Sequence, residues 1–154
     1  MTLYKKIMVP LDGSKLAECV PVHVEAVSKG CQPSEAVYVR VIEALPRGRV
    51  SAPFGEDQKR LESADRERAK EYLEGIVRNL HYEGIELHAE VISGKAAEEF
   101  ATEAEANKVD LIVTAAHGHA GPSRWVFGRS AERILRSACV PILRVRAPGC
   151  VPGI

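Results

Sequence analysis

Residues 109–145, VDLIVTAAHGHAGPSRWVFGRSAERILRSACVPILRV, combine a predicted strand, two spaced glycines and a predicted helix. An apolar strand is predicted at 111–116, Gly118 and Gly128 follow with nine residues between them, and a helix is predicted from about Ser130. A strand that turns through glycines into a helix can hold a phosphate, because backbone N–H groups approach the anion closely and the helix N-terminus adds its positive dipole end. The stretch therefore predicts a phosphate-containing ligand.

The rest of the chain alternates strands and helices. The predicted strands are 6–10, 36–42, 85–92, 111–116 and 141–146. The predicted helices are 14–29, 63–80, 95–107 and 130–137, with Gly30 and Gly84 as stop signals. Such alternation predicts an α/β domain with a mostly parallel sheet, right-handed crossovers and helices on both faces.

Residues 43–62 break this periodicity. Pro46, Gly48, Pro53 and Gly55 occur there among charged residues. A connection of this length is unusual inside a compact domain and is often a lid or a binding loop. We therefore expect a mobile loop over this stretch.

Length, charge and cysteine content limit the number of domains, the kinds of partner and the cellular compartment that we expect. The 154 residues correspond to one domain, and 21 Lys and Arg balance 21 Asp and Glu, which argues against nucleic acid or anionic lipid as a partner. The apolar run near the N-terminus is too short for a signal peptide or a membrane span. The four cysteines form no C-x-x-C pair and are interpreted as reduced thiols of a cytoplasmic protein.

Ligands of open parallel sheets bind beyond the carboxyl ends of the strands, at a topological switch point. In this pattern the first and fourth predicted strands lie side by side at that point. Asp12 follows the first strand, Val41 and Ile42 end the second, and residues 115–118 end the fourth. These residues form the predicted site.

Five short motifs occur in a characteristic order along the chain. They are VPLDGS at 9–14, VRVIE at 39–43, VDLIV at 109–113, SAERIL at 130–135 and VPILRV at 140–145. Together they resemble the universal stress protein family over nearly the whole length. The resemblance implies a Rossmann-like, adenine nucleotide alpha hydrolase-like fold: an open, twisted, five-stranded parallel sheet in the order 3-2-1-4-5. It also implies a single domain at 1–146, followed by a flexible tail at 147–154.

The resemblance further implies a stress-response regulator that binds ATP or another adenine nucleotide together with Mg²⁺. Asp12 and Val41 would hold the nucleoside, although Asp12 also suits an Asx-type turn. The residues expected to contact the nucleotide are Pro10, Leu11, Asp12, Val41, Thr114, Ala115, Gly118, Gly128, Arg129 and Ser130.

Two residues depart from the pattern of the ATP-binding members. Ala115 stands where glycine is usual, and Arg129 stands where serine or threonine is usual. The methyl group of Ala115 matters if the backbone needs a positive φ or approaches a phosphate closely. Arg129 loses a hydroxyl but offers a guanidinium that can pair with phosphate. Two hypotheses therefore stay open: a nucleotide-binding regulator, and an interaction module of the same fold that has lost the nucleotide.

An enzyme is the least favoured hypothesis. The chain has no G-x-x-x-x-G-K-S/T loop and no identifiable catalytic base. His117 and His119 are interpreted as loop residues, because no third metal ligand is spaced near them. Arg40, on a strand expected to be buried, is interpreted as extending its side chain from the strand end toward water. No catalytic residue and no metal ligand is predicted.

The strand at 141–146 is expected at an edge of the sheet, where unpaired N–H and C=O groups favour pairing with another chain. The resemblance implies a homodimer through this edge, with the two strands antiparallel about a two-fold axis. On this hypothesis Val145→Pro removes an edge donor and separates the dimer. An unidentified protein partner is also expected, and neither nucleic acid nor a membrane.

Overall fold

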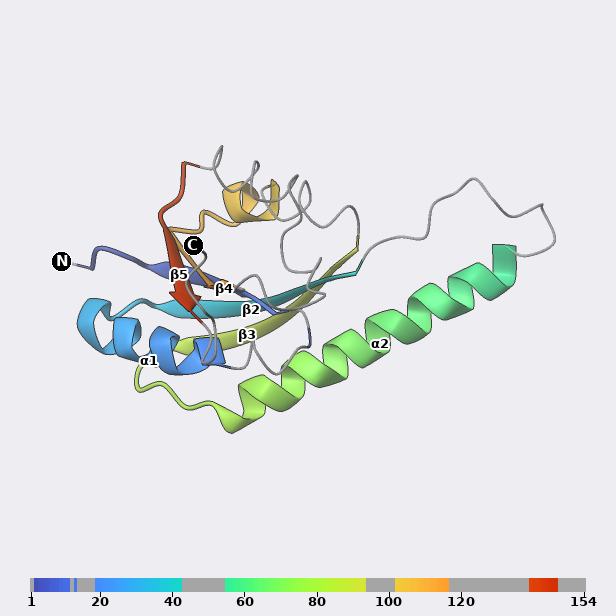
Figure 1. The fold of residues 1–154 in the computed structure, drawn as a ribbon, viewed down its shortest axis with the longest axis horizontal. Coiled ribbons are helices and arrows are strands. Elements are labelled where there is room, and N and C mark those ends of the chain that lie inside the picture. Colours follow the sequence, from blue (N-terminus) through green and yellow to red (C-terminus); the bar gives the residue numbers. More distant parts are fainter. Residues whose placement is uncertain are drawn as a thin grey trace, which may run out of the picture.

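The computed structural model describes residues 2–11, 13, 19–42, 55–93, 102–116 and 139–146. Its strands are β1 (Lys6–Pro10), β2 (Glu35–Ile42), β3 (Glu86–Ser93), β4 (Leu111–Ala116) and β5 (Ile142–Arg146). Its helices are α1 (Val20–Cys31), α2 (Gly55–Asn79) and a short helix at 102–106. The strands form one sheet in the order β3-β2-β1-β4-β5 with every pairing parallel, which confirms the predicted fold class (Figure 1).

Two hydrophobic cores cover the two faces of the sheet, because alternate residues of a strand point to opposite sides. Figure 1 shows α1 and α2 on one face and the helix at 102–106 on the other. The first core, on the α1 and α2 face, contains Ile7, Val9, Leu11, Val20, Val24, Ala36, Tyr38, Leu73, Tyr82, Leu111, Val113, Ala115 and Val145. The second core contains Met8, Val37, Val39, Ile92, Ala104, Val109 and Ile112.

A pair of buried phenols connects α1 to the sheet and to the segment before β3. Tyr82 donates a hydrogen bond to the carbonyl of Pro21 at 2.9 Å, so Tyr38, whose hydroxyl is 2.7 Å away, donates to Tyr82. Burial raises the pKa of both phenols, and both stay protonated. Each hydroxyl therefore has a partner inside the first core.

Helix α1 ends at a residue that the sequence did not indicate. The predicted stop at Gly30 is wrong, because the helix continues to Cys31 and Gln32 takes the left-handed conformation with φ 47°. The N–H of Gln32 donates to the carbonyl of Ser28 at 2.9 Å, which completes the cap. Pro33 follows and cannot continue the helix. A non-glycine residue thus serves as the C-cap.

Helix α2 begins earlier than predicted. Residues 55–62, expected to be part of a mobile loop, are helical, whereas residues 43–54 lie outside the described part. The carboxylates of Glu56 and Asp57 in the first turn interact favourably with the positive end of the helix dipole. The side-chain amide of Gln58 donates a hydrogen bond to the carboxylate of Glu62, one turn further along the helix. The apolar periodicity is absent because this half of α2 extends past the sheet, where Leu61 is 57% exposed (Figure 1).

Helix α2 ends within one residue of the predicted end. It stops at Asn79, and the predicted stop signal Gly84 lies further along the chain. Gly84 takes φ +74° in the turn that leads into β3.

Among the described segments, no helix has the length and apolar composition needed to cross a bilayer.

Strand β5 forms one edge of the sheet, and its register corrects one prediction. Ile112 donates to the carbonyl of Pro141 at 3.0 Å, and Ala115 is level with Val145. In a parallel ladder, alternate residues turn their backbone N–H and C=O groups to the same neighbour, so Pro141, Leu143 and Val145 turn theirs toward β4. Val145→Pro would therefore break a bond within the subunit, and Val145 is itself 4% exposed in the first core. Val145→Pro is thus the wrong variant for testing the edge.

Candidate functional site

The carboxyl ends of three neighbouring strands meet at the predicted site. Strand β1 lies between β2 and β4, so Pro10, Val41 and Thr114 come to the same edge of the sheet. Leu11 extends the pairing past the end of β1, because its N–H donates to the carbonyl of Val39 at 2.8 Å. This edge corresponds to the switch point of an open α/β sheet.

The apolar residues at this edge present mainly backbone. The side chain of Leu11 is 3% exposed and belongs to the first core, and Pro10 is buried. Val41 is half-buried, and its side chain packs against the second core. An adenine ring at this edge would therefore meet the backbone of β1 and β2 and small apolar surfaces, which suits a flat, weakly polar base.

Thr114, like Ser28 on α1, carries a buried hydroxyl that has no hydrogen-bond partner among the described residues. Thr114 is 1% exposed. A buried hydroxyl without a partner normally costs folding free energy, so each such group in a native structure calls for an explanation. A donor or acceptor on a bound ligand would provide one.

The surroundings of Ala115 show where its methyl group lies. Its side chain is 5% exposed and lies in the first core, on the α1 and α2 face. Its φ is not positive: Gln32 and Lys108 are the described non-glycine residues with positive φ. The methyl group therefore requires no backbone strain.

Several predicted residues cannot be placed. Asp12, Gly118, Gly128, Arg129 and Ser130 lie outside the described residues, as do His117, His119 and Trp125. The tail at 147–154 also lies outside them. The described residues contain no group of three or more His, Cys, Asp or Glu side chains that could hold a metal ion.

The sequence missed one pair at this edge. Gly13 takes φ +85°, and the guanidinium of Arg40 lies directly against it. The same guanidinium lies over the ring of Tyr72, with Cζ 5.4 Å from the ring centroid. Arg40 is half-buried, and its guanidinium contacts two parts of the protein. The turn-forming Gly13 was the only signal in the sequence.

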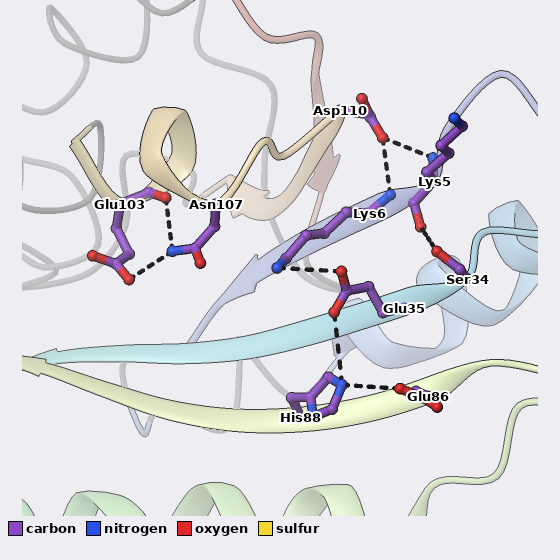
Figure 2. A network of polar contacts seen from close by, with 9 residues as sticks. All are labelled: Lys5, Lys6, Ser34, Glu35, Glu86, His88, Glu103, Asn107 and Asp110. Atoms are coloured by element: carbon purple, nitrogen blue, oxygen red, sulfur yellow. Dashed lines mark hydrogen bonds and ion pairs between the residues drawn. The ribbon is translucent and has the colours of Figure 1, made fainter.

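A polar network occupies the opposite, amino end of the sheet. The carboxylate of Asp110 accepts hydrogen bonds from the backbone N–H groups of Lys5 at 2.8 Å and Lys6 at 3.0 Å (Figure 2). The hydroxyl of Ser34 donates to the carbonyl of Lys5, and the Nζ of Lys6 lies 3.2 Å from Glu35. These contacts join the starts of β1, β2 and β4 and are structural.

A cavity of about 570 Å³ also lies toward the amino end of the sheet. Its walls come from the second half of α1 and from the segment between α2 and β3, including Ser28, His81 and Tyr82. None of the predicted ligand contacts lines this cavity. It therefore serves as an internal reference for experiments that locate the ligand.

Comparison with known proteins identifies the family. The family model of the Universal stress protein family matches residues 3–146, and the chain belongs to this family. Universal stress protein MJ0531 of Methanocaldococcus jannaschii is 30% identical over 146 residues, which cover 95% of this chain and 84% of that protein. Universal stress protein MJ0577 of the same organism is 28% identical over 156 residues, with coverage of 94% and 96%.

Solved structures agree with this assignment. The structure of MJ0577 has a TM-score of 0.76 to this chain at 28% identity and covers 96% of this chain and 99% of that one. A universal stress protein family member from Arabidopsis thaliana, solved with AMP bound, has a TM-score of 0.62 at 15% identity, with coverage of 94% and 93%. The latter likeness shows the fold alone.

Proposed function

We propose that this protein is a regulatory protein that binds an adenine nucleotide at the carboxyl ends of β1 and β4. The nucleoside would lie against Pro10, Leu11, Asp12 and Val41. The phosphates would be held by the glycine-containing stretch from Gly118 to Ser130, with Arg129 as a charged contact. A Mg²⁺ ion would neutralise part of the phosphate charge, and no catalytic step is assigned.

The observation that carries the proposal is the environment of Thr114 and Ala115 at the end of β4. The buried Thr114 hydroxyl has no hydrogen-bond partner among the described residues, and Ala115, at the position where glycine is usual, has no positive φ. The second finding supports nucleotide binding, because the methyl group packs into the first core without backbone strain. Family membership and the AMP-bound relative support the same ligand class.

Isothermal titration of the purified protein with Mg-ATP, Mg-ADP and AMP tests the proposal, with the fluorescence of Trp125 as a second readout. We expect saturable binding in both readouts. Arg129→Glu should abolish it and Arg129→Ser should retain it, because a carboxylate repels phosphate whereas a hydroxyl can bond it. Ala115→Gly should leave the affinity near the wild-type value, since the methyl group faces the core.

The absence of heat and of a fluorescence change up to millimolar nucleotide would contradict the proposal. If the double variant Ala115→Gly, Arg129→Ser then bound nucleotide, the protein would be the interaction module that kept the fold and gave up the ligand. The two hypotheses left open by the sequence are thus separated by one set of proteins.

The proposal includes a homodimer through the outer edge of β5. This edge strand is short and carries Leu143, which is 38% exposed. A charge on an edge strand opposes pairing with another strand. We expect Leu143→Glu to give a monomer in sedimentation velocity, whereas the matched control Val22→Glu, at a 68% exposed position of α1, should remain a dimer. A Leu143→Glu dimer would contradict this interface.

A further inference from the structure

Arg40 lies near the carboxyl end of β2 with its side chain on the α1 and α2 face of the sheet. The residue is half-buried, and its neighbour Tyr38 on the same face is 0% exposed. Its Cζ atom is 5.4 Å from the centroid of the Tyr72 ring on α2. A guanidinium within about 6 Å of an aromatic ring is attracted by the electron density of its face. The ring of Tyr72 therefore holds one side of the Arg40 guanidinium.

Gly13 lies against the same guanidinium, in the connection that leaves β1. A Cβ atom built on Gly13 would lie 3.0 Å from Nη1, 3.2 Å from Cζ and 3.3 Å from Nη2 of Arg40. These three similar distances mean that the group presents its broad side to the glycine. The φ of +85° favours glycine at this position, and a Cβ there would displace the guanidinium by a few tenths of an ångström.

The guanidinium of Arg40 thus contacts both Gly13 and the ring of Tyr72, and these three groups together are called the stack. The groups come from the β1–α1 connection, β2 and α2, which are far apart in the sequence. The described residues provide no ion pair or hydrogen bond for Arg40. The cation–π contact with Tyr72 favours this position of the guanidinium.

We propose that Arg40 is a positioning residue of the nucleotide site, which fixes Gly13, just past the end of β1, against Tyr72 of α2. The inference rests on the proposed function, because Gly13 directly follows Asp12, the expected nucleoside contact. A connection that is free to take other conformations is binding-competent for only part of the time, and the apparent affinity falls by that fraction. The stack raises that fraction without touching the nucleotide.

Mg-ATP titrations of Arg40→Met and Tyr72→Leu test the proposal. Each variant should bind about two- to fivefold more weakly, the range expected for a cation–π contact at a partly exposed site. The double variant should be no weaker than either single variant, because both remove the same stack. The conservative Tyr72→Phe, which keeps the ring, should restore most of the affinity. Arg60→Met, which removes an exposed guanidinium from α2, is the matched control.

Wild-type affinity in Arg40→Met, or additive losses in the double variant, would overturn the proposal. So would a loss of thermal stability in Arg40→Met with the affinity unchanged, because that result describes a purely structural side chain.

A measurement without ligand separates this inference from the proposed function. Nitrogen-15 relaxation of the Gly13 amide should show a lower order parameter in Arg40→Met and Tyr72→Leu than in the wild type and Arg60→Met. If the wild-type protein binds no nucleotide, the proposed function fails, but a loosened Gly13 would still establish the stack as the support of this connection. An unchanged order parameter in both variants would overturn the inference by itself.

Discussion

Replacing Thr114 with valine should stabilise the protein and weaken its binding of nucleotide. Thr114 is 1% exposed, and within the described part of the chain its Oγ1 atom has no hydrogen-bond partner. Leaving a buried hydroxyl unsatisfied costs about 1–3 kcal/mol. Valine keeps the shape of the side chain and replaces the hydroxyl with a methyl group. We therefore expect the free energy of unfolding of Thr114→Val to rise by about 1–3 kcal/mol.

Urea denaturation and a thermal scan measure this effect. In a domain of this size, 1 kcal/mol corresponds to roughly 2–4 °C in Tm, so the Tm should rise by several degrees. Thr114→Ser is the control, because it keeps the hydroxyl and removes a buried methyl group, which should lower the stability by about 1 kcal/mol. A loss of stability in Thr114→Val would refute the reasoning, since it would mean that the hydroxyl is hydrogen-bonded in the folded protein.

The same variant should bind Mg-ATP more weakly. A hydrogen bond contributes about 0.5–1.5 kcal/mol net, which corresponds to roughly a two- to tenfold change in Kd. A gain in stability accompanied by a loss of affinity is typical of a residue kept for function. Unchanged affinity in Thr114→Val would show that the ligand does not use this hydroxyl.

Other variants test the packing and the charges. Tyr82→Phe should lower the free energy of unfolding by about 2–3 kcal/mol and Tyr38→Phe by about 1 kcal/mol. Only Tyr82→Phe leaves two buried groups, the Tyr38 hydroxyl and the Pro21 carbonyl, without their hydrogen bond. Equal losses in urea denaturation would contradict this order. Burial and the neighbouring Glu103 carboxyl raise the pKa of Glu90 above its ordinary value of 4.5, so its protonated form contributes stability at acid pH that is lost as the pH rises through the raised pKa. Glu90→Gln should therefore gain stability relative to the wild type between pH 4.5 and neutrality, and parallel stability curves would refute the shift. Gly75→Ala should stabilise α2 by about 0.5–1 kcal/mol in thermal scans, because nothing lies within 4 Å of the new Cβ, and a lower Tm would argue against that open space.

The sequence predicted the strands well because most are short apolar runs bounded by glycine, proline or charge, and β3 alternates apolar and polar residues. It predicted less where solvent or tertiary contacts decide the structure. The first half of α2 has no apolar stripe, since it extends past the sheet, and its charged helix formers were interpreted as loop. The cap at Gln32 and the orientation of Val145 depend on hydrogen-bond geometry that residue types do not encode.

The candidate site was also predicted only in part. The edge that collects Pro10, Val41 and Thr114 follows from the strand order, which the family resemblance implied. The position of Arg40 does not follow from it, because the stack brings together three segments that no local pattern relates. The core-facing direction of the Ala115 methyl group likewise required the register of β4 beside β5.

Amide chemical-shift mapping with Mg-ATP shows whether the nucleotide binds at the carboxyl edge of the sheet. We expect the largest shifts at Leu11, Val41 and Thr114 and none at Ser28 and Tyr82, which line the cavity toward the amino end. Shifts that cluster at Ser28 and Tyr82, or no shifts at millimolar nucleotide, would contradict the account.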